Sequence, residues 1–360
     1  MQGHITAFYL FDVAESADLE RLAALMKGAT VPARFAPKPA VPAYVQYQQP
    51  PLQLEPEALG LTGIDQWQVR YKIFDYAVVS VSLVQEFAGE WSDLIALSGR
   101  LTAESTLEQA AERHCHALVD RIGPALLHPR TRFLSEDYFV FAVTALEPPA
   151  TAEALLASKA DQLAQLLRGE HEPLSAQERD EVLRHRLSYL ATDLVIPTWS
   201  TAFVYDTAMG VQAALEIFEY ANSQLLQFRY YDELLDGELA RIYKELESYR
   251  DYRSWLPRRY TRAARQVHAL FIDVNELTDR TENALKLVGD VYAARLLALV
   301  HSRLGVTAWR DSVHDKLKTL DEIYRFAVDQ TGMERGELLE LTIVAILVLE
   351  LVLFFMGIMK

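Results

Sequence analysis

Arginine and aromatic residues alternate in one short stretch of an otherwise acidic chain. The chain has 35 basic and 50 acidic residues and a net charge of −15. Guanidinium groups beside aromatic rings can bind RNA or lipid headgroups. Pairing with acidic side chains of the same subunit, or of a partner, explains them equally simply and is the preferred interpretation. The residues of this arginine patch are Arg250, Arg253, Arg258, Arg259, Arg262, Arg265 and Trp255.

Four carboxylates spaced three residues apart, Asp273, Glu276, Asp279 and Glu282, could in principle hold a metal. Di-metal sites in helical bundles use Glu-x-x-His pairs from facing helices, and the nearby His268 is off that spacing. A solvated helix face, or pairing with arginines across a hairpin, is the simpler interpretation. The common nucleotide and metal motifs do not occur in the sequence. We therefore predict no metal, no cofactor and no catalytic residue.

The triplet His114-Cys115-His116 offers three further metal-ligand types. On a helix, adjacent residues point in different directions, so one site cannot easily use all three. We expect core and surface positions rather than a metal site. As the chain's one cysteine, Cys115 excludes an intramolecular disulfide and fits a reducing compartment.

The C-terminal segment carries a different signal, because Glu350 is the one charged residue from Leu341 to Met359. A helix over this run is roughly 28 Å long, close to a bilayer core of about 30 Å. The N-terminus has no signal-peptide pattern, so we expect a cytoplasmic body and a transmembrane anchor. Near the bilayer midplane Glu350 should be protonated or paired. Hydrogen bonding within a homo-oligomer is the first interpretation, and a neutral residue without a role is the second.

The elements that must position these residues change in kind along the chain. The first part mixes strand and helix signals, which predicts an α+β domain. The expected strands and helices there are Ile5–Val13, Asp18–Met26, Trp67–Phe87, Ser105 to about Leu127, and Asp137–Leu146.

After Pro148-Pro149 the signals are helical. One helix is expected over Thr151–Arg168, and Ser175 with Glu178 forms a capping box that begins another. From Val204 onward, apolar residues recur at a spacing near 3.5, which predicts two long helices joined by a short turn.

The predicted fold is an α+β N-terminal domain followed by a mainly α-helical region with a long antiparallel coiled-coil hairpin and one C-terminal transmembrane helix. The expected boundaries are 1–150 for the α+β domain, 151–200 for a helical connector, 201–330 for the hairpin region and 337–359 for the transmembrane helix.

Three segments carry a resemblance to a known family: one beginning LATDLVIPTWSTAFVYDTAM, one beginning RRYTRAARQVHALFIDVNEL, and KLKTLDEIYRFAVDQ. With the apolar C-terminus, they make Ser188–Lys360 similar to the bacterial branch of the RMD1/DUF155 family, which includes sporulation-related and mitochondrial-translation-related membrane proteins. FDYAVVSVSL and EDYFVFAV extend the resemblance loosely toward the N-terminus. The resemblance implies the same overall plan and brings no catalytic residues.

Polar residues of the two long helices match the recurring pattern of that family and are unusually polar for a helical seam. We interpret them as a buried or inter-subunit hydrogen-bond network that fixes the register of the helices at a cost in stability. Its members are Asp206, Glu219, Asn222, Arg229, Asp273, Asn275, Glu276, Arg280 and Asn283.

Together these features predict a tail-anchored membrane protein of the bacterial plasma membrane, a homo-oligomeric scaffold or tether without an identified reaction. A membrane-bound enzyme that acts on nucleic acid or phosphate-containing substrates through the N-terminal domain is one alternative. An RNA- or ribosome-associated membrane tether is another. The expected partners are the lipid bilayer, a second copy of the chain and a protein at the membrane; the negative charge disfavours nucleic acid.

Overall fold

The computed structural model describes residues 1–26, 30–32, 51–54, 67–248, 269–279, 291–323, 325, 343–344 and 346–348. The chain divides into two compact units. The first comprises Met1–Tyr230 with Leu277–Arg310, and the second comprises Tyr231–Glu276 with Asp311–Lys360.

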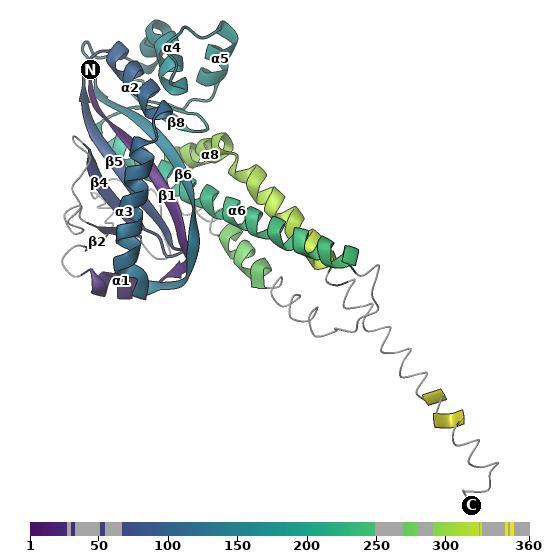
Figure 1. Cartoon of the computed structure of the whole chain (residues 1–360). Coiled ribbons are helices and arrows are strands. Elements are labelled where there is room, and N and C mark those ends of the chain that lie inside the picture. Colours follow the sequence, from purple (N-terminus) through teal and green to yellow (C-terminus); the bar gives the residue numbers. More distant parts are fainter. Residues whose placement is uncertain are drawn as a thin grey trace, which may run out of the picture. The chain divides into compact units, whose positions relative to one another are not determined.

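In the described part of the first unit, the strands form one eight-stranded mixed sheet (Figure 1) in the order β2-β3-β4-β5-β1-β6-β8-β7. Neighbouring strands are antiparallel except β6 and β8, which are parallel. The strands are β1 (Gln2–Ala17), β2 (Thr30–Pro32), β3 (Leu52–Leu54), β4 (Gln68–Ile73), β5 (Val78–Ala88), β6 (Leu126–Ala145), β7 (Leu194–Pro197) and β8 (Thr201–Tyr205).

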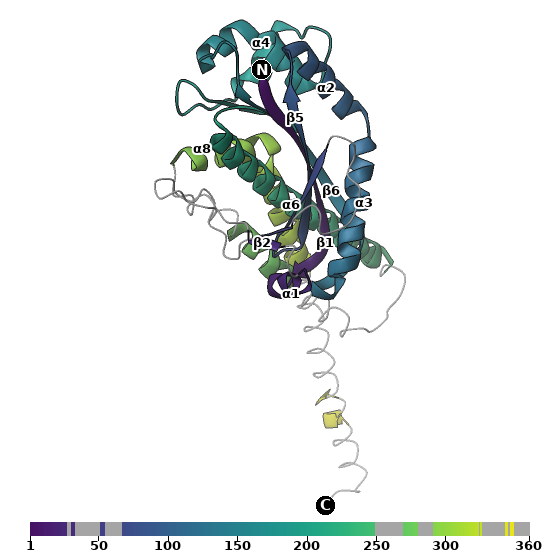
Figure 2. The same ribbon diagram turned by 90° about the vertical axis from the view of Figure 1, so that its left-hand side faces the viewer.

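Helices cover both faces of this sheet. Helix α3 lies along one face, and the first part of α6 lies on the other (Figures 1 and 2). The helices whose bounds are described are α1 (Leu19–Leu25), α2 (Trp91–Ala103), α3 (Thr106–Ile122), α4 (Ala152–Arg168), α5 (Ala176–Arg184), α6 (Ala208–Ser248) and α8 (Val291–Leu304), with a 3-10 turn at Gly123–Ala125.

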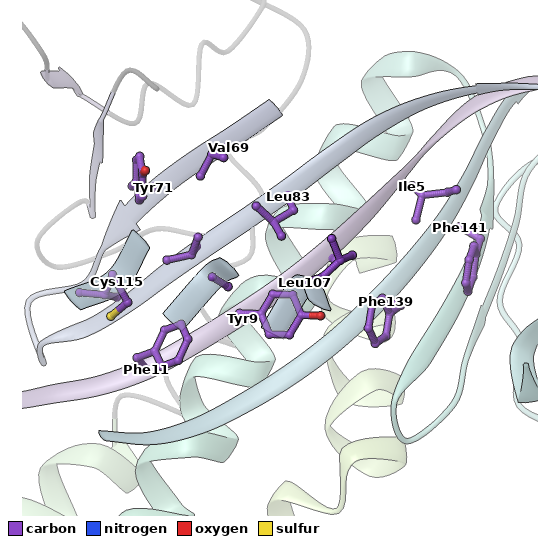
Figure 3. Close-up of a cluster of buried hydrophobic side chains, with 14 of the residues drawn as sticks. Ile5, Tyr9, Phe11, Val69, Tyr71, Leu83, Leu107, Cys115, Phe139 and Phe141 are labelled. Atoms are coloured by element: carbon purple, nitrogen blue, oxygen red, sulfur yellow. The ribbon is translucent and has the colours of Figure 1, made fainter. Parts of the chain in front are cut away.

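The face under α3 is the apolar core of the first unit (Figure 3). Successive residues of a strand point to opposite faces, and every second residue of β1 from Ile5 to Val13 is a buried apolar or aromatic residue of this core. The adjacent strands add Leu83 and Phe141, and α3 contributes Leu107 and Leu118. This regular alternation explains why β1 and β5 form strands here.

The second unit is helical in its described part. It contains the later part of α6, helical residues within 269–276, and helical residues within 311–323. Lys316 stabilises this unit by ion pairs of 2.8 Å with Asp232 and 2.7 Å with Asp236. Its buried apolar residues are Leu235, Ile242, Val274, Val313, Leu317 and Leu320.

Most of the elements expected before residue 150 are confirmed, with longer strands than predicted. The Trp67–Phe87 region is a hairpin of β4 and β5, joined by a turn in which Ala77 has a φ of 54°. Helix α3 begins after Ser105 as expected, but the Ser105 side chain makes no capping bond to the backbone. Its hydroxyl accepts a hydrogen bond from Gln109 Nε2 instead.

The expectation of an entirely helical region after residue 150 is wrong. Residues 194–197 and 201–205 form strands β7 and β8, which complete the sheet, and α6 begins at Ala208 rather than near Val204. The segment Thr201–Tyr205 is rich in β-branched and aromatic residues, which favour strands. A short, continuously apolar run does not distinguish a buried strand from a buried helix by periodicity. The α4 helix and the Ser175 cap of α5 are confirmed.

The predicted transmembrane helix over 337–359 is not upheld. Among the described residues, no helix is both long and apolar enough to cross a bilayer. This finding corrects the fold prediction, the tail-anchored function with its two membrane-bound alternatives, and the plasma-membrane localisation. The length and apolar composition of a segment permit a membrane span and do not by themselves establish one. Most of 337–359, including Glu350, lies outside the described residues.

Candidate functional site

The face of the sheet under α6 differs from the core face because the register brings polar residues of several strands into rows. Lys72 of β4 lies opposite Gln53 of β3 and opposite Ser80 of β5. In the next row along the strands, Arg70 lies opposite Ser82. Two basic residues and two hydroxyls therefore lie next to one another on one face of neighbouring strands.

Helix α6 adds carboxylates above these rows. Glu216 and Glu219 are three residues apart and lie on the same side of the helix. Lys72 Nζ forms an ion pair with Glu219, and the Tyr76 hydroxyl lies 2.6 Å from Ser223 Oγ. Lys72 and Tyr76 are four residues apart, and so are their partners Glu219 and Ser223. These two contacts show that this part of α6 runs in the same direction as β4.

These residues line a cavity of about 70 Å³ between the sheet and α6. About 10–15 Å³ of such volume holds one water molecule, so the cavity has room for a small group of atoms. Both strand and helix residues form its wall: Thr6, Phe8, Pro51, Gln53, Arg70, Tyr71, Lys72, Ser82, Val84, Gln212, Leu215, Glu216 and Glu219.

One pair of opposite charges in the pocket is already matched. The side chains of Lys72 and Glu219 are 13% and 6% exposed, so both are largely withdrawn from water. Ser82 Oγ lies 3.5 Å from the other carboxylate oxygen of Glu219. A buried ion pair of this kind is costly to break, because removing one partner leaves the other charge without compensation.

A second pair of opposite charges is not matched internally. Burial raises the pKa of Glu216, more than the nearby Lys72 ammonium lowers it, and the neighbouring Glu219 adds to the increase. The side chain of Glu216 accepts a long hydrogen bond of 3.4 Å from Gln212 Nε2. Among the described residues, Arg70 makes no ion pair, although both Arg70 and Glu216 line the cavity. The pocket therefore contains one cation and one carboxylate that a ligand could satisfy.

Thr6 adds an unsatisfied group to the same wall. The residue is 2% exposed, and within the described part of the chain its hydroxyl has no hydrogen-bond partner. A buried hydroxyl without a partner costs about 1–3 kcal/mol. Such a group beside a cavity is a natural point of contact for a bound polar molecule.

A second polar cluster lies further along the same face. Asp12 of β1 is completely buried, and its Oδ2 is 2.8 Å from Nε of Arg130 on β6. The Arg130 guanidinium carbon lies 3.4 Å from the centre of the Tyr230 ring. Burial raises the pKa of Asp12 to about 6, and the neighbouring Arg130 guanidinium opposes this increase. Arg229 of α6 pairs with Glu136 of β6 nearby.

The structure places the predicted helical polar residues in different environments. The first part of α6 contains Glu219, Asn222 and Arg229. Two of them form ion pairs with residues of the sheet, Glu219 with Lys72 and Arg229 with Glu136. The Asn222 side chain donates to its own helix at Phe218 O, 2.8 Å away. Asp206 precedes α6, and burial raises its pKa.

The remaining members of that predicted network belong to later helical segments of the chain. Asp273, Asn275 and Glu276 lie in the described helical segment 269–279, and Arg280 and Asn283 lie outside the described residues. The network across the long helices, and the self-association predicted from it, stay predictions.

The arginine patch, Arg250, Arg253, Trp255, Arg258, Arg259, Arg262 and Arg265, also lies outside the described residues. Its proposed binding to an acidic protein surface stays a prediction, as do the predicted domain boundaries.

The His114-Cys115-His116 triplet separates as helical geometry requires. His114 is buried, with Nδ1 2.7 Å from the Tyr71 hydroxyl, and burial lowers its pKa. Cys115 is fully buried in the core, which raises the pKa of its thiol. His116 is exposed and stacks on Phe133. In the part of the chain that the structure describes, no three His, Cys, Asp or Glu side chains gather as a metal site would need.

The sequence did not single out most of the pocket residues. Glu219 was among the predicted polar helix residues, but its partner Lys72 lies 147 positions away on a strand with no unusual local pattern. Polar residues at alternate positions of β4 and β5, namely Arg70, Lys72, Ser80 and Ser82, were the available signal.

The comparisons with known proteins point to a family without an assigned function. Residues 2–212 match the family model described as "Uncharacterized protein MJ0711, N-terminal domain". The chain is 27% identical over 194 residues to the uncharacterized protein MJ0711 of Methanocaldococcus jannaschii. That alignment covers 53% of this chain and 58% of the relative, so less than two thirds of the relative's length is matched. No solved structure matches the chain.

Proposed function

We propose that this chain, which belongs to the family of the MJ0711 N-terminal domain, binds a small polar ligand in the pocket beneath α6. The observation that carries the proposal is the combination of unmatched Arg70 and Glu216 with the unpartnered hydroxyl of Thr6 around one cavity. Thr6 is buried, and Arg70 and Glu216 are partly buried. Polar and charged groups withdrawn from water are costly unless they are paired. A ligand that satisfies all three would recover that cost on binding.

The size of the cavity restricts the ligand. Pockets for drug-sized molecules measure about 300–1,000 Å³, and this cavity measures about 70 Å³. A nucleotide or a large cofactor is therefore a poor fit. A molecule of a few non-hydrogen atoms, or the charged end of a longer one, matches both the volume and the polar wall.

Binding is favoured over catalysis by the contacts inside the pocket. Of the serine and threonine hydroxyls that line the pocket, that of Ser82 is the one with a carboxylate in reach, and Oγ lies 3.5 Å from Glu219 Oε1. The Tyr71 hydroxyl is bound to His114 in the apolar core on the other face of the sheet. A nucleophile and its base usually lie about 2.6–3.2 Å apart. In addition, Glu219 is already engaged in an ion pair with Lys72.

A thermal-shift screen of small polar metabolites against the full chain tests this proposal. At ligand concentrations well above Kd, binding stabilises the folded state by mass action, by about 2.7 kcal/mol at 100 times Kd. The matched variant is Ser82→Leu, in which a larger side chain fills the cavity. Ligand-dependent stabilisation should be lost in this variant.

Because Ser82→Leu could also disturb folding, Thr6→Val provides an independent check that keeps the side-chain shape. A ligand that contacts the Thr6 hydroxyl should bind Thr6→Val more weakly while the variant stays folded by circular dichroism. A screen in which no small polar compound stabilises the wild type would contradict the proposal.

We further propose that the family membership extends to the RMD1/DUF155 group. The support is the similarity of the segments within Ser188–Lys360, most of which the match over 2–212 does not include. Profile comparison of Ser188–Lys360 with RMD1/DUF155 sequences tests it. The expected result is a continuous alignment through the region of α6 and α8; a match confined to isolated helical segments would contradict it.

A further inference from the structure

We propose that the ligand of the α6 pocket is a small zwitterion with a carboxylate and a primary ammonium group, such as a small α-amino acid. This inference rests on the proposed binding function and specifies its ligand class. Arg70 binds the carboxylate, and Glu216 binds the ammonium.

The arrangement of the charges across the pocket favours two opposite charges on one ligand. Lys72 and Glu219 form an ion pair, and Glu216 precedes Glu219 on α6 by nearly one helical turn, which is about 5.4 Å. Two residues back along β4, about 6.6 Å, reaches Arg70. Arg70 and Glu216 thus form the next pair of positions along the same helix–strand contact, on opposite walls of the cavity.

The Arg70–Glu216 position differs from the Lys72–Glu219 position in one respect. Lys72 and Glu219 are joined by an ion pair, whereas the described residues contain no ion pair between Arg70 and Glu216. A guanidinium offers several N–H donors in a plane and suits a carboxylate. A half-buried carboxylate accepts hydrogen bonds from an ammonium, which has three donors. A molecule with both groups bridges the gap without leaving either protein charge unpaired.

The remaining polar groups fit the same ligand class. The Thr6 hydroxyl can donate to a ligand carboxylate or accept from a ligand ammonium. Glu219 is neutralised by Lys72, so the pocket carries one cation and one anion for the ligand. A doubly charged anion such as phosphate would face the Glu216 carboxylate, and a diamine would face Arg70. Both mismatches disfavour ligands of a single sign.

Binding of L-alanine and two size-matched analogues to the full chain tests this inference. Ethylamine is alanine without its carboxylate, and propionate is alanine without its ammonium. Isothermal titration calorimetry should show L-alanine, or glycine or L-serine, binding about tenfold or more tightly than either analogue, because each analogue loses a charge-assisted hydrogen bond.

Two variants separate the roles of the charges. Arg70→Gln should remove the advantage of L-alanine over ethylamine, and Glu216→Gln should remove its advantage over propionate. Arg113→Gln and Glu112→Gln are matched controls, because both residues are exposed on α3, which packs on the other face of the sheet. They should leave all affinities unchanged.

The outcomes distinguish this inference from the broader proposal. If propionate or inorganic phosphate binds as tightly as L-alanine and depends on Arg70 but not on Glu216, the pocket is an anion site and the zwitterion is wrong. If ethylamine binds as tightly and depends only on Glu216, the zwitterion is also wrong. In both cases the pocket still binds a small polar ligand. If none of these compounds binds and the wider metabolite screen is negative, the proposed function itself fails.

Discussion

The face of the sheet under α3 and the face under α6 are made by the same strands, yet they bury different chemistry. On β1, alternate residues from Ile5 to Val13 give the first face only apolar and aromatic side chains, whereas Thr6 and Asp12 point to the second. β5 repeats the contrast, with Leu83 on one face and Ser82 on the other. Burial of apolar surface is the main stabilising contribution on the first face, where the polar Tyr71 and His114 are paired with each other. The second requires specific partners for each polar group.

This difference separates stability from function within one sheet. The α6 face retains Lys72, Glu219, Arg70 and Glu216, although apolar residues of similar volume would often stabilise a fold equally well or better. Polar groups that raise the cost of folding are most simply explained by the binding role proposed for the pocket.

The largest expected effect comes from breaking the apolar face. Phe141 is fully buried in the core, and Phe141→Ala should lower the free energy of unfolding by about 3–5 kcal/mol, because the transfer energy is lost and a cavity remains. Urea unfolding followed by circular dichroism measures this change. Leu127→Ala, at a 52% exposed position, is the control and should stay within about 0.5 kcal/mol. A loss below about 1 kcal/mol for Phe141→Ala would mean that this face is not the main source of stability.

On the polar face, removal of one partner of the buried ion pair should cost nearly as much. Lys72→Met leaves the Glu219 carboxylate, 6% exposed, without its partner. The expected loss is about 3 kcal/mol or more. The double variant Lys72→Met/Glu219→Leu should recover most of it, because no buried charge remains. Urea unfolding of both single variants and the double variant gives the coupling energy, and additive losses would show that the pair does not interact.

The cluster at Asp12 should make the polar face sensitive to pH. The pKa of the Asp12 carboxyl is raised from 3.8 to about 6 in the folded state, so the folded state binds this proton more tightly than the unfolded state. The stability contribution of Asp12 therefore rises as the pH falls from about 6 to about 4, by up to about 3 kcal/mol. Above pH 6 the carboxylate is ionised in both states, and this contribution is absent.

Comparison of the wild type with Asp12→Asn over pH 4–7.5 isolates this effect from the other acidic groups whose pKa is raised, such as Glu136 and Glu216. The wild type should gain stability relative to Asp12→Asn toward low pH. Asp12→Asn also removes the carboxylate that faces Arg130, so the change of the stability difference with pH is the test, not its absolute value. A difference that is constant with pH would show that Asp12 does not titrate in this range.

The sequence predicted the apolar face better than the polar one for a physical reason. Strands such as β1 and β5 carry their signal locally, as alternating or continuous apolar residues within about ten positions. The Ser175 cap of α5 is equally local. The apolar residues around Val204 fit the spacing of a strand and that of a helix equally well. The sequence therefore predicted the start of a helix where the structure has strand β8.

The pocket could not be predicted because its parts are brought together only by the fold. Arg70 and Lys72 come from β4, Thr6 from β1 and Glu216 from α6. Each looks like an ordinary solvated residue in its own segment. Sequence patterning identified Glu219 as unusually polar, but the register of four strands and the placement of α6 were needed to find its partner and the cavity beside it.

The smallest effect expected is also the most specific test of the polar face. Thr6→Val replaces the unpartnered hydroxyl with a methyl group of the same shape, so the ligand-free protein should gain about 1 kcal/mol in free energy of unfolding. The control Thr131→Val, at an exposed position of β6, should change stability by less than about 0.5 kcal/mol. A loss of stability in Thr6→Val would mean that a bound molecule already satisfies this hydroxyl. With saturating ligand the wild type should become the more stable of the two proteins, because only the wild type can use the hydroxyl for binding. The two faces of the sheet would then differ in kind: the polar groups of the α6 face find their partners in a ligand, whereas the α3 face is packed entirely by the chain itself.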